Sequence, residues 1–126
     1  MLKEIIILVT IMISIVLVDY VTQDYTKESV QEIITRLSEL EENVKSENNN
    51  FNENVKQILE TWEQKTEKLA YFIEHDELEK IETNLTNIKS FVEEKQFEWA
   101  FNSIDETKFI LNHIKEKNAF NLENIF

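Results

Sequence analysis

The stretch "EIIILVTIMISIVLVDYVTQD", residues 4–24, decides how the rest of the chain is placed. From Ile5 to Val18 it carries no charge, and Thr10 and Ser14 are its only polar residues. Counted from Leu2 to Val21, the run covers 20 residues, or about 30 Å of helix. That length matches the hydrocarbon layer of a membrane, so the sequence predicts a membrane span.

Three interpretations of this run compete: a retained anchor, a cleaved signal peptide and a core helix of a soluble domain. A core helix would show a polar face, whereas this run is apolar all round. A cleavable signal needs small residues at its cleavage site, and the stretch contains no alanine. Tyr20 and Tyr25 stand where interfacial aromatics are expected. We predict a retained anchor over residues 1–22, with a cleaved signal as the second interpretation and a core helix as the third.

The orientation of the span follows from weaker signals. Lys3 precedes it, and Lys27 and Arg36 follow it, so the positive-inside rule gives almost no preference. A short N-terminal tail before a long acidic domain favours an extracytoplasmic C-terminal domain. We predict a single-pass protein of the cell membrane in this orientation.

The composition indicates an all-α fold. The 126 residues include no Gly and no Pro, which removes the usual material for tight hairpins and phosphate-binding loops. The formal net charge is −12, and the excess of acidic residues lies beyond the apolar run. Such a chain repels nucleic acid and offers no basic patch to anionic lipids. The absence of cysteine excludes disulfides and thiolate chemistry.

Four amphipathic stretches follow the span, with apolar residues three and four positions apart. They run over Val30–Val44, Phe51–Ile73, Leu78–Val92 and Phe97–Ile114. Similar lengths and short connections predict an antiparallel bundle of about four helices over residues 26–126.

The connections and the end of the chain carry their own signals. Asn48, Asn49 and Asn50 suit a turn without glycine, and Asp76 with Glu79 looks like a capping box. The polar "EEKQ" separates the last two stretches. The terminal "NAFNLENIF" is expected to fold back as an apolar tail.

The chain resembles a family of small bacterial membrane proteins, the domain of unknown function 4363. The resemblance rests on the pattern W-x6-L-A-x2-I-E-H-D-E-L-E-K-I-E-x2-L-x2-I, from Trp62 to Ile88, and on "HIKEKNAFNLENIF" from His113. It implies a membrane-anchored protein of Gram-positive type, encoded beside a multi-span membrane protein. Members similar to this chain carry Trp and Ala after the first turn, where it has Phe51 and Asn54.

No catalytic, cofactor-binding or metal-binding residue is predicted. His75 lies among acidic residues, but the Glu-x-x-His unit of helical di-iron sites is absent, and a capped helix turn explains the acids better. His113 near a helix C-terminus is expected to be structural. Trp62 and Trp99 are expected to pack in the core. Asn84 heads an "NLT" glycosylation tripeptide but falls inside a predicted helix.

The sequence therefore predicts a non-enzymatic structural or interaction module, with no cofactor and no identifiable small-molecule ligand. Its expected partners are the membrane and either a membrane protein or a second copy of the chain. The alternative is a ligand-binding or sensor ectodomain that acts through a partner, since only about four residues precede the span.

Overall fold

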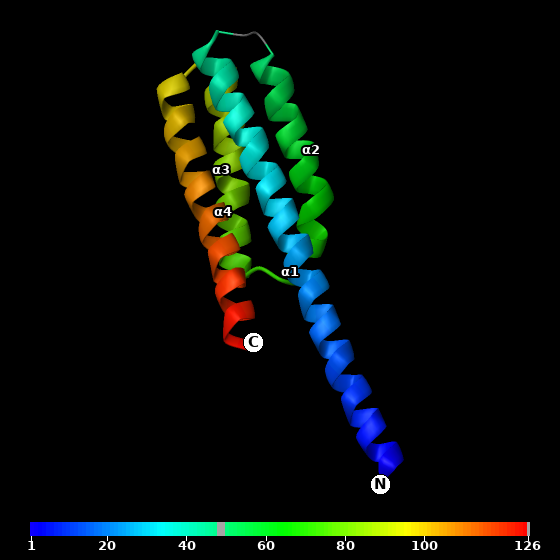
Figure 1. Ribbon diagram of the computed structural model, residues 1–126. Coiled ribbons are helices and arrows are strands. Elements are labelled where there is room, and N and C mark those ends of the chain that lie inside the picture. The colour runs from blue at the N-terminus through cyan, green and yellow to red at the C-terminus, as the bar shows by residue number, and fades with distance from the viewer. Residues whose placement is uncertain (48–49, 126) are drawn as a thin grey trace.

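The computed structural model describes residues 1–47 and 50–125, with side chains up to Lys117 in the last helix (Figure 1). Within these residues the chain forms four helices and no strand, so the all-α prediction is confirmed. The helices are α1 (Leu2–Lys45), α2 (Phe51–Leu69), α3 (His75–Glu93) and α4 (Phe97–Ile125).

The second half of α1 packs with α2, α3 and α4 as an antiparallel four-helix bundle, and the first half projects beyond it (Figure 1). Each helix contacts the next in sequence, α4 closes the ring against α1, and α2 packs least closely against α3. The predicted bundle is confirmed, and its first helix is the continuation of the apolar run. The turn between α2 and α3 lies where α1 leaves the bundle, and the other two turns lie at the far end.

α1 runs through the expected boundary at residues 22–26 without a break. No Gly or Pro interrupts it, and the Thr26 hydroxyl donates to the Thr22 carbonyl at 3.0 Å, which satisfies it inside the helix. Thr26 and Ser29 are already buried by the bundle. The apolar run and the bundle are therefore joined by helix rather than by a flexible linker.

The core is a single cluster drawn from all four helices. Each amphipathic stretch turns its apolar stripe inward, as its spacing predicts. The most completely buried large side chains are Ile33, Leu37, Leu40, Ile58, Leu69, Ile81, Leu85, Ile88, Ile104, Leu111 and Ile114. Thr107 is also fully buried, and its hydroxyl donates to the Ser103 carbonyl at 2.6 Å.

Two helix ends use left-handed residues other than glycine. Glu47 after α1 has φ 58°, and Lys95 after α3 has φ 59°. At the second end, the Lys95 amide donates to the Val92 carbonyl and the Gln96 amide donates to the Phe91 carbonyl, at 3.1 and 2.8 Å. These two bonds form a Schellman motif with lysine at the position that glycine usually takes.

Three local expectations need correction or restriction. The capping role predicted for Asp76 is wrong, because the N-cap of α3 is Glu74, two residues earlier. Asp76 instead lies in the first turn, where its charge favours the helix dipole. The predicted reversal of the last segment is wrong, because α4 continues to Ile125. Of the three turn asparagines, Asn48 and Asn49 lie outside the described residues, and Asn50 is the N-cap of α2.

Candidate functional site

The first half of α1 is a large apolar surface that no other helix of the bundle covers. None of its most apolar 18-residue window is buried, and residues such as Ile7, Leu8 and Ile13 are more than half exposed. By length and composition, α1 is the one helix among the described residues that could cross a membrane. In water this surface would be unfavourable, so it needs lipid or another apolar surface.

The polar residues within this run are satisfied by the helix itself. The Thr10 hydroxyl donates to the Ile6 carbonyl at 2.8 Å, and the Ser14 hydroxyl donates to the Thr10 carbonyl at 2.9 Å. A hydrocarbon layer offers no hydrogen-bond partners, so such internal pairing is what a spanning helix requires. The two hydroxyls are thus compatible with lipid.

An aromatic cluster lies where the exposed run enters the bundle. The Tyr25 ring meets the Phe72 ring edge-on, with centroids 6.5 Å apart, and the ammonium groups of Lys65 and Lys68 lie over Tyr25 at 5.5 and 5.7 Å. Tyr71 beside Phe72 is 82% exposed. This cluster joins α1, the end of α2 and the turn that follows it.

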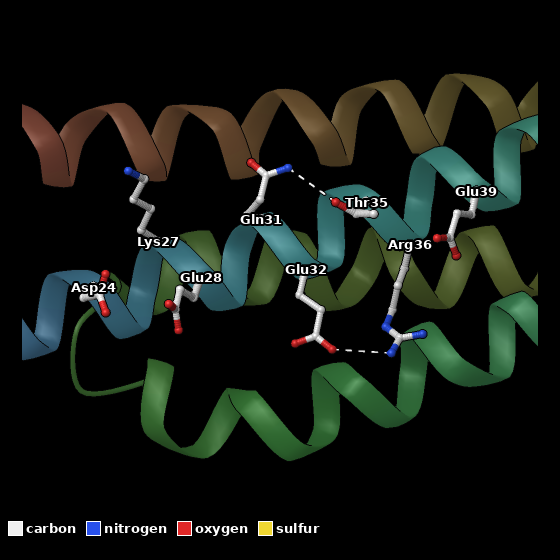
Figure 2. Close-up of a pocket in the computed structure, with 8 residues that line it drawn as sticks. All are labelled: Asp24, Lys27, Glu28, Gln31, Glu32, Thr35, Arg36 and Glu39. Carbon is white, nitrogen blue, oxygen red and sulfur yellow. Dashed lines mark hydrogen bonds and ion pairs between the residues drawn. The ribbon is translucent and has the colours of Figure 1, made fainter.

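A surface hollow of about 550 Å³ runs along α1 and is lined by polar and charged side chains. Figure 2 shows Glu32 and Arg36 reaching toward α2, while Lys27 and Gln31 point to the opposite side of the helix. Arg36 donates to Glu32 and to Gln57, both at 3.4 Å, and Lys65 lies 3.7 Å from Glu32. Two of the charged groups, Glu32 and Arg36, contact α2, and the hollow is an open groove on the surface of α1.

The ionisable groups form pairs across helices. The Glu41 carboxylate of α1 accepts a bond from Lys108 of α4 at 2.8 Å and pairs with Lys45 at 3.1 Å. The hydrogen bond from Lys108 is the main reason that the pKa of Glu41 lies below its usual value, and partial burial opposes it. Glu74 and Lys117 pair at 2.8 Å on the surface, where that contact lowers the pKa of Glu74 and raises that of Lys117.

The histidines considered from the sequence do not gather acids into a cluster. His75 pairs with Glu79 at 2.9 Å, and both side chains are mostly exposed. In the part of the chain that the structure describes, no group of three or more His, Asp or Glu side chains could hold a metal ion. His113 lies exposed on α4.

The two tryptophans have different surroundings. Trp62 is buried in the core, as predicted, whereas the prediction for Trp99 is wrong because it is 62% exposed. Trp99 lies beside Phe91 on the surface, with ring centroids 6.2 Å apart. Asn84 is buried on α3, so its tripeptide could not accept a sugar in the folded protein.

Sequence reasoning missed the exposed aromatic turn after α2. Its signal was available: "LAYFI", residues 69–73, is an uncharged apolar stretch in a chain that is 30% charged. The spacing predicts that it continues the second helix, with Phe72 on the apolar stripe.

A four-helix bundle carried on a long exposed helix that is apolar enough to cross a membrane defines an all-α class of protein. The chain belongs to the family described as Domain of unknown function (DUF4363), whose family model matches residues 20–125. This match begins at the end of the apolar run and covers the whole bundle. No curated protein and no solved structure matches the chain.

Proposed function

We propose that this protein is a membrane-anchored interaction module. The first half of α1 crosses the membrane once as an uncleaved signal-anchor, and the bundle stands on the extracytoplasmic side. There it contacts a membrane protein or a second copy of itself. The proposal depends above all on one observation: a single 44-residue helix is both the exposed apolar run and a core helix of the bundle.

The continuity of α1 supports an interaction role because it fixes the bundle relative to the span. A core helix cannot tilt or slide without disturbing residues such as Ile33 and Leu37, which are completely buried. A partner that holds the span therefore also orients the bundle. This is how a small protein without chemistry of its own can act as a scaffold.

We propose further that the protein is not an enzyme. The hollow along α1 is open to solvent, and two of the charged groups that line it, Glu32 and Arg36, pair with each other and contact Lys65 and Gln57 of α2. The same observation gives the alternative, a ligand-binding ectodomain, less support than the interaction role.

Extraction of the full-length protein from its native membrane tests the anchor. We expect it to stay in the membrane at alkaline pH and to be released by detergent. Release by alkaline buffer without detergent would contradict the anchor.

Crosslinking in the same membranes tests the partner. A photoreactive residue at Trp99 or Phe109, both well exposed, should capture a defined membrane protein or the chain itself. The matched control carries the same residue at Lys3, outside the bundle. Capture of one identical set of abundant proteins from all three positions would contradict a dedicated partner.

A further inference from the structure

The turns at the two ends of the bundle differ sharply in polarity. At the end far from the apolar run, the connections read "SENNN" over residues 46–50 and "EKQ" over residues 94–96. At the near end, the connection between α2 and α3 begins "AYFI", residues 70–73. Surface loops are normally polar, so an apolar turn at one end only needs an explanation.

This apolar turn both seals the core and exposes aromatic surface. Leu69 and Ile73 are buried beneath it and hold its backbone against the bundle. Tyr71 and Phe72 are left 82% and 39% exposed, with their ring centroids 6.4 Å apart. An exposed pair of aromatics on a fixed turn marks a contact surface.

The position of the turn along α1 identifies the contact. The Phe72 ring touches Tyr25, which follows Val21, the last residue of the apolar run, by four residues, or about 6 Å of helix. The interfacial zone on each side of a bilayer is about 5–7 Å thick, as total and hydrocarbon thicknesses imply. If α1 crosses the membrane, the turn lies within that zone.

We propose that the α2–α3 turn rests in the lipid–water interface, with Tyr71 and Phe72 among the lipid head groups, as a second attachment of the bundle to the membrane. This inference rests on the proposed anchor and adds a contact that the anchor does not require. Amphipathic aromatic rings favour this zone. Tyr25 lies on α1 at the level of the turn, and Tyr20 lies about 7.5 Å closer to the apolar run. The turn, the two tyrosines and the end of the span then form one aromatic collar around the base of the bundle.

Lipid fits this surface better than a protein partner does. The α2–α3 turn lies where α1 leaves the bundle, and a bilayer crossed by α1 would have its surface near that point (Figure 1). Lys65 and Lys68, whose ammonium groups lie over Tyr25, would then lie close to the lipid phosphates. Because the chain as a whole is strongly acidic, aromatic burial rather than overall charge must hold the contact, so it should persist at high salt.

The absence of cysteine allows a direct measurement of depth. The full chain is prepared with one cysteine, as Tyr71→Cys, Trp99→Cys or Ile13→Cys, and labelled with a polarity-sensitive fluorophore. It is then placed in nanodiscs of phosphatidylethanolamine and phosphatidylglycerol, with or without brominated lipid. Tyr71 and Trp99 are similarly aromatic and exposed but lie at opposite ends of the bundle, so they are matched.

We expect the label at residue 71 to emit at shorter wavelength than the label at residue 99 and to be quenched by lipids brominated near the head group. Quenching at residue 71 should remain at high salt, and the label at residue 99 should resemble one in water. Circular dichroism of each variant confirms that the bundle is intact.

Three results would overturn the proposal, and they are distinguishable. If residue 13 is quenched by lipid but residue 71 behaves as residue 99 does, the anchor stands and the interfacial contact is wrong. If residue 13 is not quenched, the anchor itself is wrong and the contact fails with it. A label at residue 71 that emits at short wavelength but is not quenched by brominated lipid would show that a second copy of the chain, and not lipid, covers the turn.

Discussion

Glu41 joins the first helix of the bundle to the last. Its carboxylate accepts from Lys108 at 2.8 Å, and the two side chains are only 19% and 21% exposed. Because it is partly buried, this pair contributes more to the stability of the fold than the Glu74–Lys117 pair, which has the same separation but is exposed to solvent. Two ion pairs with the same separation therefore contribute differently to the free energy of unfolding, according to how exposed they are.

We predict that Glu41→Gln lowers the free energy of unfolding by about 1 kcal/mol at neutral pH. The folded pKa of Glu41 is lowered, so the pair contributes fully above the unfolded value near 4.5 and loses its contribution as pH falls through the folded value. The variant and the parent protein should converge in acid. Denaturant unfolding followed by circular dichroism measures both effects, and Glu74→Gln, the exposed control, should cost less at neutral pH.

The turn after α3 shows how this chain ends a helix without glycine. Lys95 takes the left-handed conformation, which costs a residue with a Cβ about 1–2 kcal/mol. We predict that Lys95→Gly raises the free energy of unfolding by up to about 1 kcal/mol, since glycine relieves this strain at some cost in chain entropy.

The matched control for Lys95→Gly is Lys89→Gly, an exposed change in the middle of α3 that removes the same charge. It should lower the free energy of unfolding by about 1 kcal/mol. Equal effects at the two positions in thermal or denaturant unfolding would refute the role assigned to the left-handed turn.

The helices and their inward faces were predictable because the three- and four-residue spacing is strong and no breaker interrupts it. Leu37, Ile81 and Ile104 lie in the core as their periodicity predicts. Helix ends were less predictable, because Glu74 and Asp76 are both acceptable near an N-terminus and only packing selects between them. The exposure of Trp99 and Phe72 also escaped prediction, since an aromatic residue near an apolar stripe normally packs in the core.

In the whole molecule, α1 couples the proposed span to the bundle, and the stiffness of the helix between them can be tested. Asp24 is exposed on α1 just beyond the apolar run. Asp24→Pro would remove the amide that a helix bonds to the carbonyl of Tyr20 and would clash with that carbonyl. We predict a bundle that remains folded but takes varied tilts.

Spin labels at Ile13→Cys and Phe109→Cys in nanodiscs would measure this tilt as a distance distribution. The distribution should be narrow in the parent and in Asp24→Ala, which loses the same charge, and broad in Asp24→Pro. A distribution equally narrow in all three would mean that contacts other than helix continuity set the angle.

Because α1 is continuous, it also fixes the rotation of the bundle about the axis of the apolar run. Because an α-helix turns about 100° per residue, a single residue inserted between Val21 and Thr26 would swing the bundle by about 100° around the long axis of the span. Seven inserted residues would return it almost to its original azimuth, about 10 Å farther out. The affinity of a partner that binds both the span and the bundle should therefore depend on the number of residues in this junction, because that number sets the angle between the two binding surfaces.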